Sequence, residues 1–133
     1  MISSGDTKQK VALLDSARAL QKAGYPIYAS EGTARFLADN GVKARTVSWP
    51  DEKHPGRKGV MEMIADHAFD LVINVPKNHT KRELTNGYKI RRGAIDHNIP
   101  LITNARLASA FIEAFTTIGE KDLQIKSWQE YDN

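Results

Sequence analysis

Two hydroxyl residues and a glycine stand close together in the tetrapeptide Ser30-Glu31-Gly32-Thr33, between a short apolar run and a helical pattern. In a turn from a strand into a helix, the first backbone N–H groups of the helix have no internal partner and lie at the positive end of its dipole. A phosphate or carboxylate there gains both donors and a favourable field. Gly32 permits close approach, and the hydroxyls can donate to ligand oxygens. The turn predicts an anion site, with plain N-capping by Ser30 or Thr33 as the alternative.

Further polar side chains follow the next two apolar runs of the chain. Trp49 ends the first of these runs and offers a flat apolar wall with one N–H. Because ligands of parallel sheets bind beyond the carboxyl ends of the strands, we expect these side chains to share one pocket with the turn. The second run, at 69–75, contains the amide of Asn74 near its end. It is followed by another amide and by positive charges, namely Asn78, Lys77 and Lys81.

The elements that must position these residues alternate between strand and helix patterns. Asp6 and Gln9 form a capping-box-like start of a first helix, and Gly24 stops it. The run at 69–75 is apolar on both faces and predicts the middle strand of a sheet. The alternation predicts an α/β fold with a parallel sheet and right-handed crossovers. After the first helix we expect strands at 26–29, 42–49, 69–75 and 100–103, and helices at 33–40, from 60, at 88–97 and at 105–116.

Length and composition limit the organisation and the function classes. A chain of 133 residues with 41% hydrophobic content can bury one core, so residues 1–133 are predicted to form a single domain. The absence of cysteine excludes a disulfide framework, a thiolate nucleophile and cysteine-based zinc ligation. The N-terminus is polar after two residues, and no apolar run approaches the roughly 20 residues of a membrane span. We therefore expect a cytoplasmic protein without a membrane partner.

The net charge of +3 is spread unevenly along the chain. Residues 77–92 hold one acid, Glu83, and the basic residues Lys77, Lys81, Arg82, Lys89, Arg91 and Arg92. Such a cluster is typical of a surface that meets a negative partner or simply faces solvent. It lacks the regular aromatic interleaving of single-strand binders, so we expect no nucleic-acid partner. The histidines have no zinc-site spacing, and no metal is expected: His54, His67, His79 and His97.

Four segments together resemble a known family: YASEGTA at 28–34, VSWP at 47–50, LVINVPKN at 71–78 and YKIRRGAIDHNIPLITN at 88–104. They are similar to the methylglyoxal synthase-like superfamily, and within it most to the C-terminal regulatory domain of the carbamoyl phosphate synthetase large subunit. The resemblance covers about residues 2–115. It implies a three-layer α/β/α domain with a five-stranded parallel sheet. It also implies a domain without a cofactor of its own that binds allosteric effectors such as nucleotides or N-acetylglutamate.

The resemblance also implies which residues form the effector site. Lys8 matches a lysine that contacts nucleotide phosphate in bacterial members. Lys77 stands where the N-acetylglutamate-binding members have asparagine, so a nucleotide and an amino-acid-derived effector are both open. The full implied set of effector-binding residues is Lys8, Ser30, Gly32, Thr33, Trp49, Asn74, Lys77 and Asn86.

An enzyme is the alternative, because the superfamily includes methylglyoxal synthases, lyases that act on dihydroxyacetone phosphate. That chemistry needs a positioned carboxylate base. The segment 74–78 contains no acid, and Asp51 lies outside any glycine-rich context. Glu31 is expected to face solvent. We therefore expect no catalysis by this chain itself.

The chain also has the character of a part of something larger. Only residues 1–4 are available for a strand before the start of the first helix, so the first strand is short. We expect a regulatory domain from the C-terminal end of a carbamoyl phosphate synthetase large chain, an ATP-dependent ligase of arginine and pyrimidine synthesis. The expected partners are a small anionic effector, the rest of that large chain and its glutaminase subunit.

Overall fold

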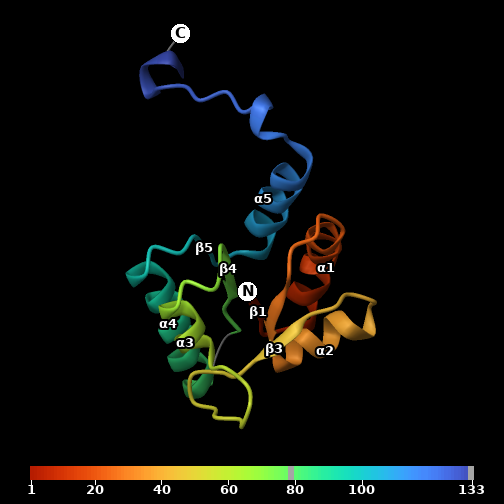
Figure 1. Ribbon diagram of the computed structural model, residues 1–133, viewed down its shortest axis with the longest axis vertical. Helices are drawn as coiled ribbons and strands as arrows, with labels where there is room; N and C mark the ends of the chain where they lie inside the picture. The colour runs from red at the N-terminus through yellow and green to blue at the C-terminus, as the bar shows by residue number, and fades with distance from the viewer. Residues whose placement is uncertain (78–79, 132–133) are drawn as a thin grey trace.

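The fold is a five-stranded parallel sheet between two layers of helices (Figure 1). The computed structural model describes residues 1–77 and 80–131, so the predicted amide of Asn78 lies outside the described residues. The strand order is β3-β2-β1-β4-β5. The expected α/β/α architecture is confirmed. The strands are β1 (Ile2–Ser4), β2 (Tyr28–Ser30), β3 (Arg45–Val47), β4 (Val72–Val75) and β5 (Leu101–Ile102).

The strand in the middle of the sheet is β1, so the prediction that the run at 69–75 forms the middle was wrong. That run contains β4, which pairs with β1 on one side and β5 on the other. Both strands are buried on both faces, but β1 carries two serines in place of the expected apolar residues. Ser3 and Ser4 are buried, and their polar groups bond to neighbouring residues, so burial does not leave them unsatisfied.

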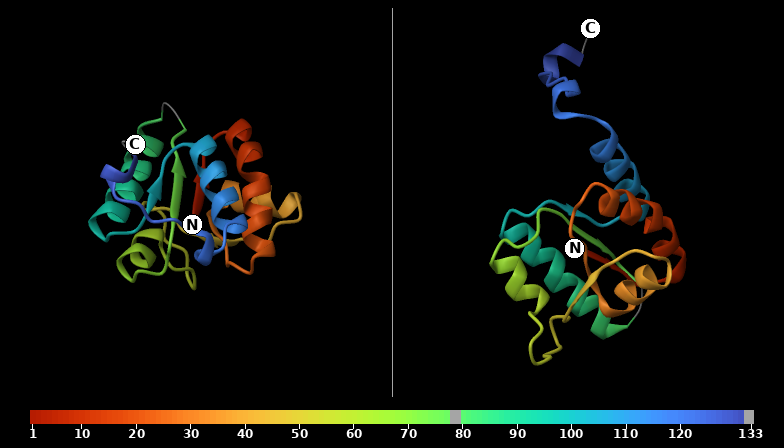
Figure 2. Two further views of the ribbon diagram at one scale, coloured as in Figure 1. Left: turned by 90° about the horizontal axis from the view of Figure 1, so that it is seen from above. Right: turned by 45° about the vertical axis from the view of Figure 1, so that its right-hand side comes forward.

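Each face of the sheet is covered by its own layer of helices (Figure 2). Each layer encloses its own apolar core against the sheet. The helices α1, α2 and α5 cover one face, and α3 and α4 cover the other. Leu13, Leu37 and Ile112 are among the buried residues of the first core. Ile64 and Ile90 belong to the second. The helices are α1 (Thr7–Lys22), α2 (Glu31–Asp39), α3 (Val60–Ala65), α4 (Lys81–Asp96) and α5 (Ala105–Thr117), followed by short 3-10 turns at Glu120–Asp122 and Trp128–Tyr131.

The predicted ends of the first helix are confirmed. The Asp6 carboxylate caps α1 by accepting from the backbone N–H of Gln9 at 2.8 Å. Gly24 and Gly41, which follow α1 and α2, have φ values of +87° and +78°. Glycine adopts these left-handed conformations without steric cost, which explains both helix ends.

Two predicted helix starts were too late. The helix α2 begins at Glu31 and not at Thr33, so the Ser-Glu-Gly-Thr segment already forms its first turn. The helix α4 begins at Lys81 and not at Tyr88. Its first turn is polar and shows no apolar periodicity, but Thr80 caps it by accepting from the backbone N–H of Glu83.

After α5 the chain runs away from the domain (Figure 1). The apolar side chains Leu123, Ile125 and Trp128 on this tail are exposed. Within residues 1–77 and 80–131, no helix is long and apolar enough to cross a bilayer. In the same part of the chain, no three His, Asp or Glu side chains gather in a way that could hold a metal ion.

Candidate functional site

The two hydroxyls of the predicted anion turn are buried and bonded to protein atoms. Ser30 accepts from the hydroxyl of Ser3 and donates to Thr33 Oγ1, both at 3.2 Å. Thr33 donates to the carbonyl oxygen of Ser4 and accepts from its N–H, again at 3.2 Å. This network fastens the first turn of α2 to the end of β1. In this structure the hydroxyls hold two elements together and do not point to an open ligand position.

The start of α2 nevertheless keeps the properties of an anion site. Ser30 is the N-cap residue, but its side chain makes no capping hydrogen bond, so capping by this hydroxyl was the wrong alternative. Gly32 in the first turn is exposed. Glu31 is also exposed and pairs with Arg35 at 3.6 Å, as expected for a carboxylate that faces solvent. Within residues 1–77 and 80–131, no side chain accepts a hydrogen bond from the backbone donors of the first turn, which lie at the positive end of the helix.

The lysine beside this turn is Lys10 and not Lys8. The Lys10 ammonium lies 3.5 Å from the point where a β-carbon on Gly32 would stand. Lys8 is exposed on the first turn of α1. The contact of Lys8 with a ligand phosphate therefore stays a prediction, and the lysine that the structure places beside Gly32 is Lys10. Positions two apart on a helix differ by about 200° around its axis, so only one of the two lysines can face the turn.

A small cavity with several charged and amide side chains in its lining lies between the carboxyl ends of β1 and β4 and the side of α4. Its volume is about 20 Å³. Ser3, which bonds to Ser30, also lines it, so the cavity is next to the turn of α2. The structure thus brings together three of the predicted residues with three others from α4: Trp49, Asn74 and Lys77 with Glu83, Gly87 and Arg91.

Arg91 is a site residue that sequence reasoning missed. Its Nη1 donates to Asn74 Oδ1 at 2.7 Å. A β-carbon on Gly87 would lie 2.8 Å from that nitrogen, so the glycine makes room for the guanidinium to lie along α4. The spacing of four residues between Gly87 and Arg91 would have signalled this only if the start of α4 had been predicted correctly.

Asn86 is 1% exposed and does not line the cavity. It faces the loop after β3, near enough to Asp51 to contribute to its lowered pKa, yet its Nδ2 completes no hydrogen bond among the described residues. Arg82 clamps the same loop to α4. It donates to Asp51 at 2.6 Å and Glu52 at 2.7 Å, and its guanidinium lies 5.8 Å from the centre of the Trp49 ring.

The Arg82 hydrogen bonds hold the pKa of the Asp51 carboxyl below its ordinary value. A general base that works near neutral pH requires a shift in the opposite direction. The geometry of this loop thus suits a structural clamp that keeps Trp49 in place.

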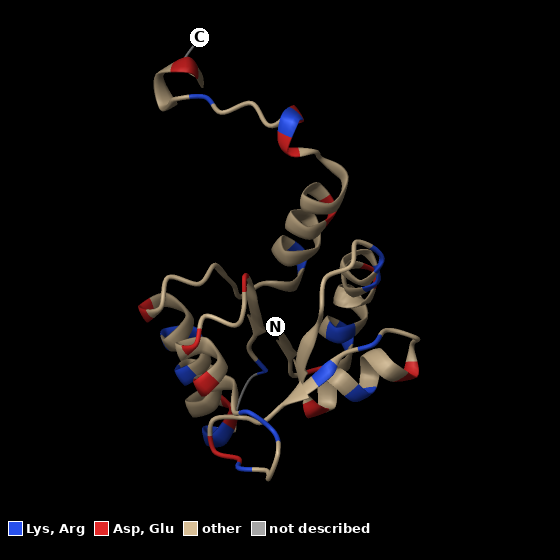
Figure 3. Cartoon of the chain, viewed as in Figure 1, with Lys and Arg blue, Asp and Glu red and all other residues tan. Residues whose placement is uncertain are grey.

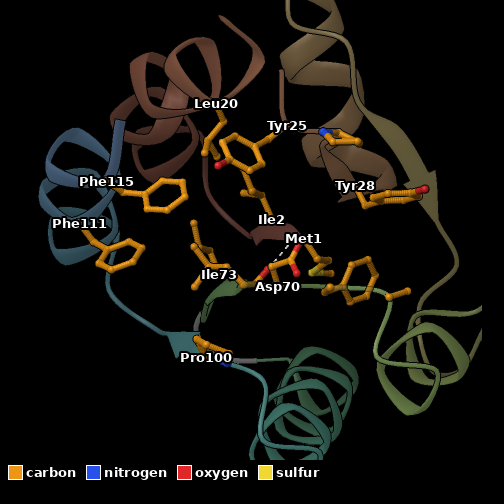
Figure 4. A pocket seen from close by; sticks show the side chains of 14 residues that line it. Met1, Ile2, Leu20, Tyr25, Tyr28, Asp70, Ile73, Pro100, Phe111 and Phe115 are labelled. Carbon is orange, nitrogen blue, oxygen red and sulfur yellow. Dashed lines mark hydrogen bonds between the residues drawn. The ribbon is translucent and has the colours of Figure 1, made fainter. Parts of the chain in front are cut away.

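A second cavity, of about 350 Å³, lies at the amino ends of the strands (Figure 4). Most of its wall is aromatic or aliphatic, and Asp70 is the one charged side chain in the lining. Among the described residues that line this cavity there is no lysine or arginine, so it has no cationic side chain to attract an anion. Its aromatic lining comes from the start of β2, the segment before β4 and the helix α5: Tyr25, Tyr28, Phe69, Phe111 and Phe115.

The sequence profile of the MGS-like domain matches residues 12–103. The multifunctional protein CAD of Squalus acanthias is 36% identical over 90% of this chain and 6% of its own length. The C-terminal section of the carbamoyl phosphate synthase large chain of Aquifex aeolicus is 37% identical over 95% of this chain and 24% of its own length. Human mitochondrial carbamoyl-phosphate synthase [ammonia] is 40% identical over 76% of this chain and 7% of its own length.

Among solved structures, methylglyoxal synthase from Elizabethkingia anophelis NUHP1 superposes with a TM-score of 0.51, covering 98% of this chain and 86% of that one. At 18% identity this match shows the fold alone. The chain spans less than a quarter of the length of the curated relatives described above. The match over residues 12–103 makes this chain a member of the MGS-like domain family, related to the C-terminal section of the carbamoyl phosphate synthase large chain.

Proposed function

We propose that this chain is an effector-binding regulatory domain of a carbamoyl phosphate synthase large chain. The observation that carries the proposal is the Lys10 ammonium beside the exposed Gly32, at a helix start that is not capped by the side chain of Ser30. A cation and free backbone donors at one point favour a phosphate or carboxylate. The family relationship supports a small metabolite as the source of that group.

The neighbouring cavity supplies the groups that would select among anions. Trp49 can lie against a base or an acyl chain, while Asn74 and Lys77 can bond to polar groups at the other end of the ligand. These features support both a nucleotide and an N-acetylglutamate-like effector. The predicted Asn86 would act indirectly: its buried amide lies beside Asp51, in the loop that follows Trp49, and would help to keep that loop in place.

The domain itself is proposed to be non-catalytic. Asp51 is engaged by Arg82, and Glu83 is the one acid among the described residues that line the small cavity. Incubation with dihydroxyacetone phosphate should therefore yield no methylglyoxal above the background reaction. The ligase chemistry, with its use of ATP in arginine or pyrimidine synthesis, would belong to the rest of the large chain. That remainder and a glutaminase subunit are the proposed partners, in the cytoplasm, and the domain needs no cofactor.

A thermal-shift screen tests the proposal. The ligands are UMP, IMP, UTP, phosphoribosyl pyrophosphate, ornithine and N-acetylglutamate. A ligand at a hundred times its Kd should stabilise the fold by about 2.7 kcal/mol. Trp49 fluorescence gives a second readout. Trp49→Phe is the control, because it removes the indole signal but keeps an aromatic ring at this position. If none of these compounds raises the midpoint at millimolar concentration, the effector proposal is wrong.

A further inference from the structure

The small cavity is too small for any of the proposed effectors. Its 20 Å³ suffices for about one water molecule, whereas a nucleotide or an acylated amino acid is many times larger. A ligand that starts at Gly32 and reaches Trp49 and Asn74 must therefore displace a side chain that fills the space. The identity of that side chain is inferred below from the lining, on the basis of the proposed effector site.

Among the charged residues that line the cavity, Glu83 has a side chain held by weak interactions. Its Oε1 lies 3.5 Å from the Nζ of Lys77, a long contact in which the lysine side chain is 46% exposed. Its Oε2 is buried and has no hydrogen-bond partner among the described residues. A carboxylate oxygen loses its hydration when it is buried without a donor, which is unfavourable. Rotation toward solvent would restore that hydration.

The charges around Glu83 are those that an acidic ligand would seek. Lys77 and Arg91 line the same cavity, and the Arg91 guanidinium is already oriented by Asn74. Glu83 is the one acid among the described lining residues, and it occupies the position next to Lys77. A ligand carboxylate or phosphate that approached Lys77 would meet both the volume and the negative charge of Glu83.

We propose that Glu83 is an internal competitor of the effector. Its carboxylate occupies the anion position beside Lys77 in the empty domain and turns out to solvent when an acidic effector binds. The apparent affinity is then lowered by the fraction of molecules in which Glu83 blocks the site. Glu83 thereby sets the effector concentration at which the domain responds, and it selects ligands whose anionic group can replace it at Lys77.

Calorimetric titration of the whole chain with UMP and with N-acetylglutamate tests this competition. The variant Glu83→Gln keeps the size of the side chain but removes its charge, and Glu83→Ala removes both. Glu113→Gln on α5 is the matched control, because it removes one exposed acid from the opposite face of the sheet. For a half-exposed charge pair, we expect Glu83→Gln to tighten binding roughly twofold to tenfold. The control should bind like the wild type.

A double-mutant cycle with Lys77→Met separates competition from general repulsion. If Glu83 competes for Lys77, Glu83→Gln tightens binding less when Lys77 is already absent. Circular dichroism of each variant confirms the folded fraction. Tighter binding by Glu83→Gln or Glu83→Ala, or binding by a variant when the wild type shows none, supports the competitor.

Wild-type binding that neither Glu83 variant tightens would overturn the competitor and leave the effector site standing. Equal tightening by Glu113→Gln would assign the effect to net charge and overturn it as well. The absence of binding by wild type and variants alike would overturn both proposals.

Discussion

The two cavities described above lie at opposite ends of one sheet and differ in volume and in the charge of their lining side chains. The hollow at the amino ends holds about 350 Å³ and is lined by aromatic rings, whereas the one at the carboxyl ends holds about 20 Å³ and is lined by Lys77, Arg91 and Asn74. The helix α5, which walls the larger hollow, carries few charges, whereas α4 carries many of both signs (Figure 3). Volume therefore does not locate the candidate site; free donors and cations do.

The side chains that line each cavity are supplied by the strand ends and helix ends that meet there. At the amino ends, aromatic side chains pack against one another, with Tyr25 and Phe115 centred 5.4 Å apart and Phe111 stacked on Phe115 at 6.0 Å. At the carboxyl ends, β1 and β2 stop in serine beside the start of α2, and β4 carries Asn74 one residue before its end. Parallel α/β sheets place helix N-termini at this end, so polar ligands gather there.

The largest expected effect is a loss of stability at the amino-end cavity that leaves anion binding unchanged. Ile73 is 1% exposed and lines the amino-end hollow. Ile73→Ala should lower the free energy of unfolding by about 2–5 kcal/mol, because it enlarges a void in the core. Urea denaturation measures this loss. Anion affinity, corrected for the folded fraction, should not change; a weaker affinity would show that the two ends are coupled.

The next effect concerns the two lysines of α1. Lys10→Met removes the ammonium beside Gly32 and should weaken the binding of a phosphate or carboxylate effector about tenfold to hundredfold, as for the loss of one charged hydrogen bond. Lys8→Met removes the same charge two residues earlier and serves as the control. Calorimetric titration of both variants decides between them. A loss of affinity in Lys8→Met alone would contradict the geometry described above.

A smaller effect is expected on stability at the turn itself. Thr33→Val keeps the shape of the side chain but leaves the N–H and C=O of Ser4 without their partner at the end of β1. The free energy of unfolding should fall by about 1–3 kcal/mol, because buried polar groups lose their hydrogen bonds. Thermal or urea unfolding provides the measurement. An unchanged stability would mean that the hydroxyl does not fasten α2 to β1.

The smallest effect is the pH dependence of the clamp beside Trp49. Because the Arg82 hydrogen bond lowers the pKa of Asp51 from 3.8, its stabilising effect is present at neutral pH and lost as the pH falls through the folded-state pKa. Arg82→Gln should therefore be less stable than the wild type at pH 7, and this difference should shrink at about pH 3. Urea midpoints at the two pH values test it. An equal difference at both would rule out the charge pair as the cause.

These comparisons also explain what the sequence could predict. Alternating apolar patterns predicted the architecture, since periodicity reports directly which faces are buried. The start of α4 was not predicted because residues 81–87 contain a single large apolar side chain, Leu84, and therefore show no such period. The central position of β1 was not predicted because two of its three residues are serines, and their hydrogen-bond partners belong to other elements.

Within the candidate site, the residues after β3 and β4 were predictable because strand ends converge. The choice of Lys10 over Lys8 was not, because it depends on the rotation of α1 against the start of α2. Arg91 was not predictable either, since its partner Asn74 lies 17 residues away on β4. Such contacts are tertiary, and no local pattern contains them.

The central claim is that a small acidic effector binds at the carboxyl end of the sheet. A titration of the ¹⁵N-labelled chain with UMP or N-acetylglutamate, followed by amide chemical shifts, tests it most directly. We expect saturable shifts at Glu31, Gly32 and Asn74, with Asp70 and Phe111 unaffected. Shifts confined to Asp70 and Phe111, or no saturable shifts with either ligand, would contradict it.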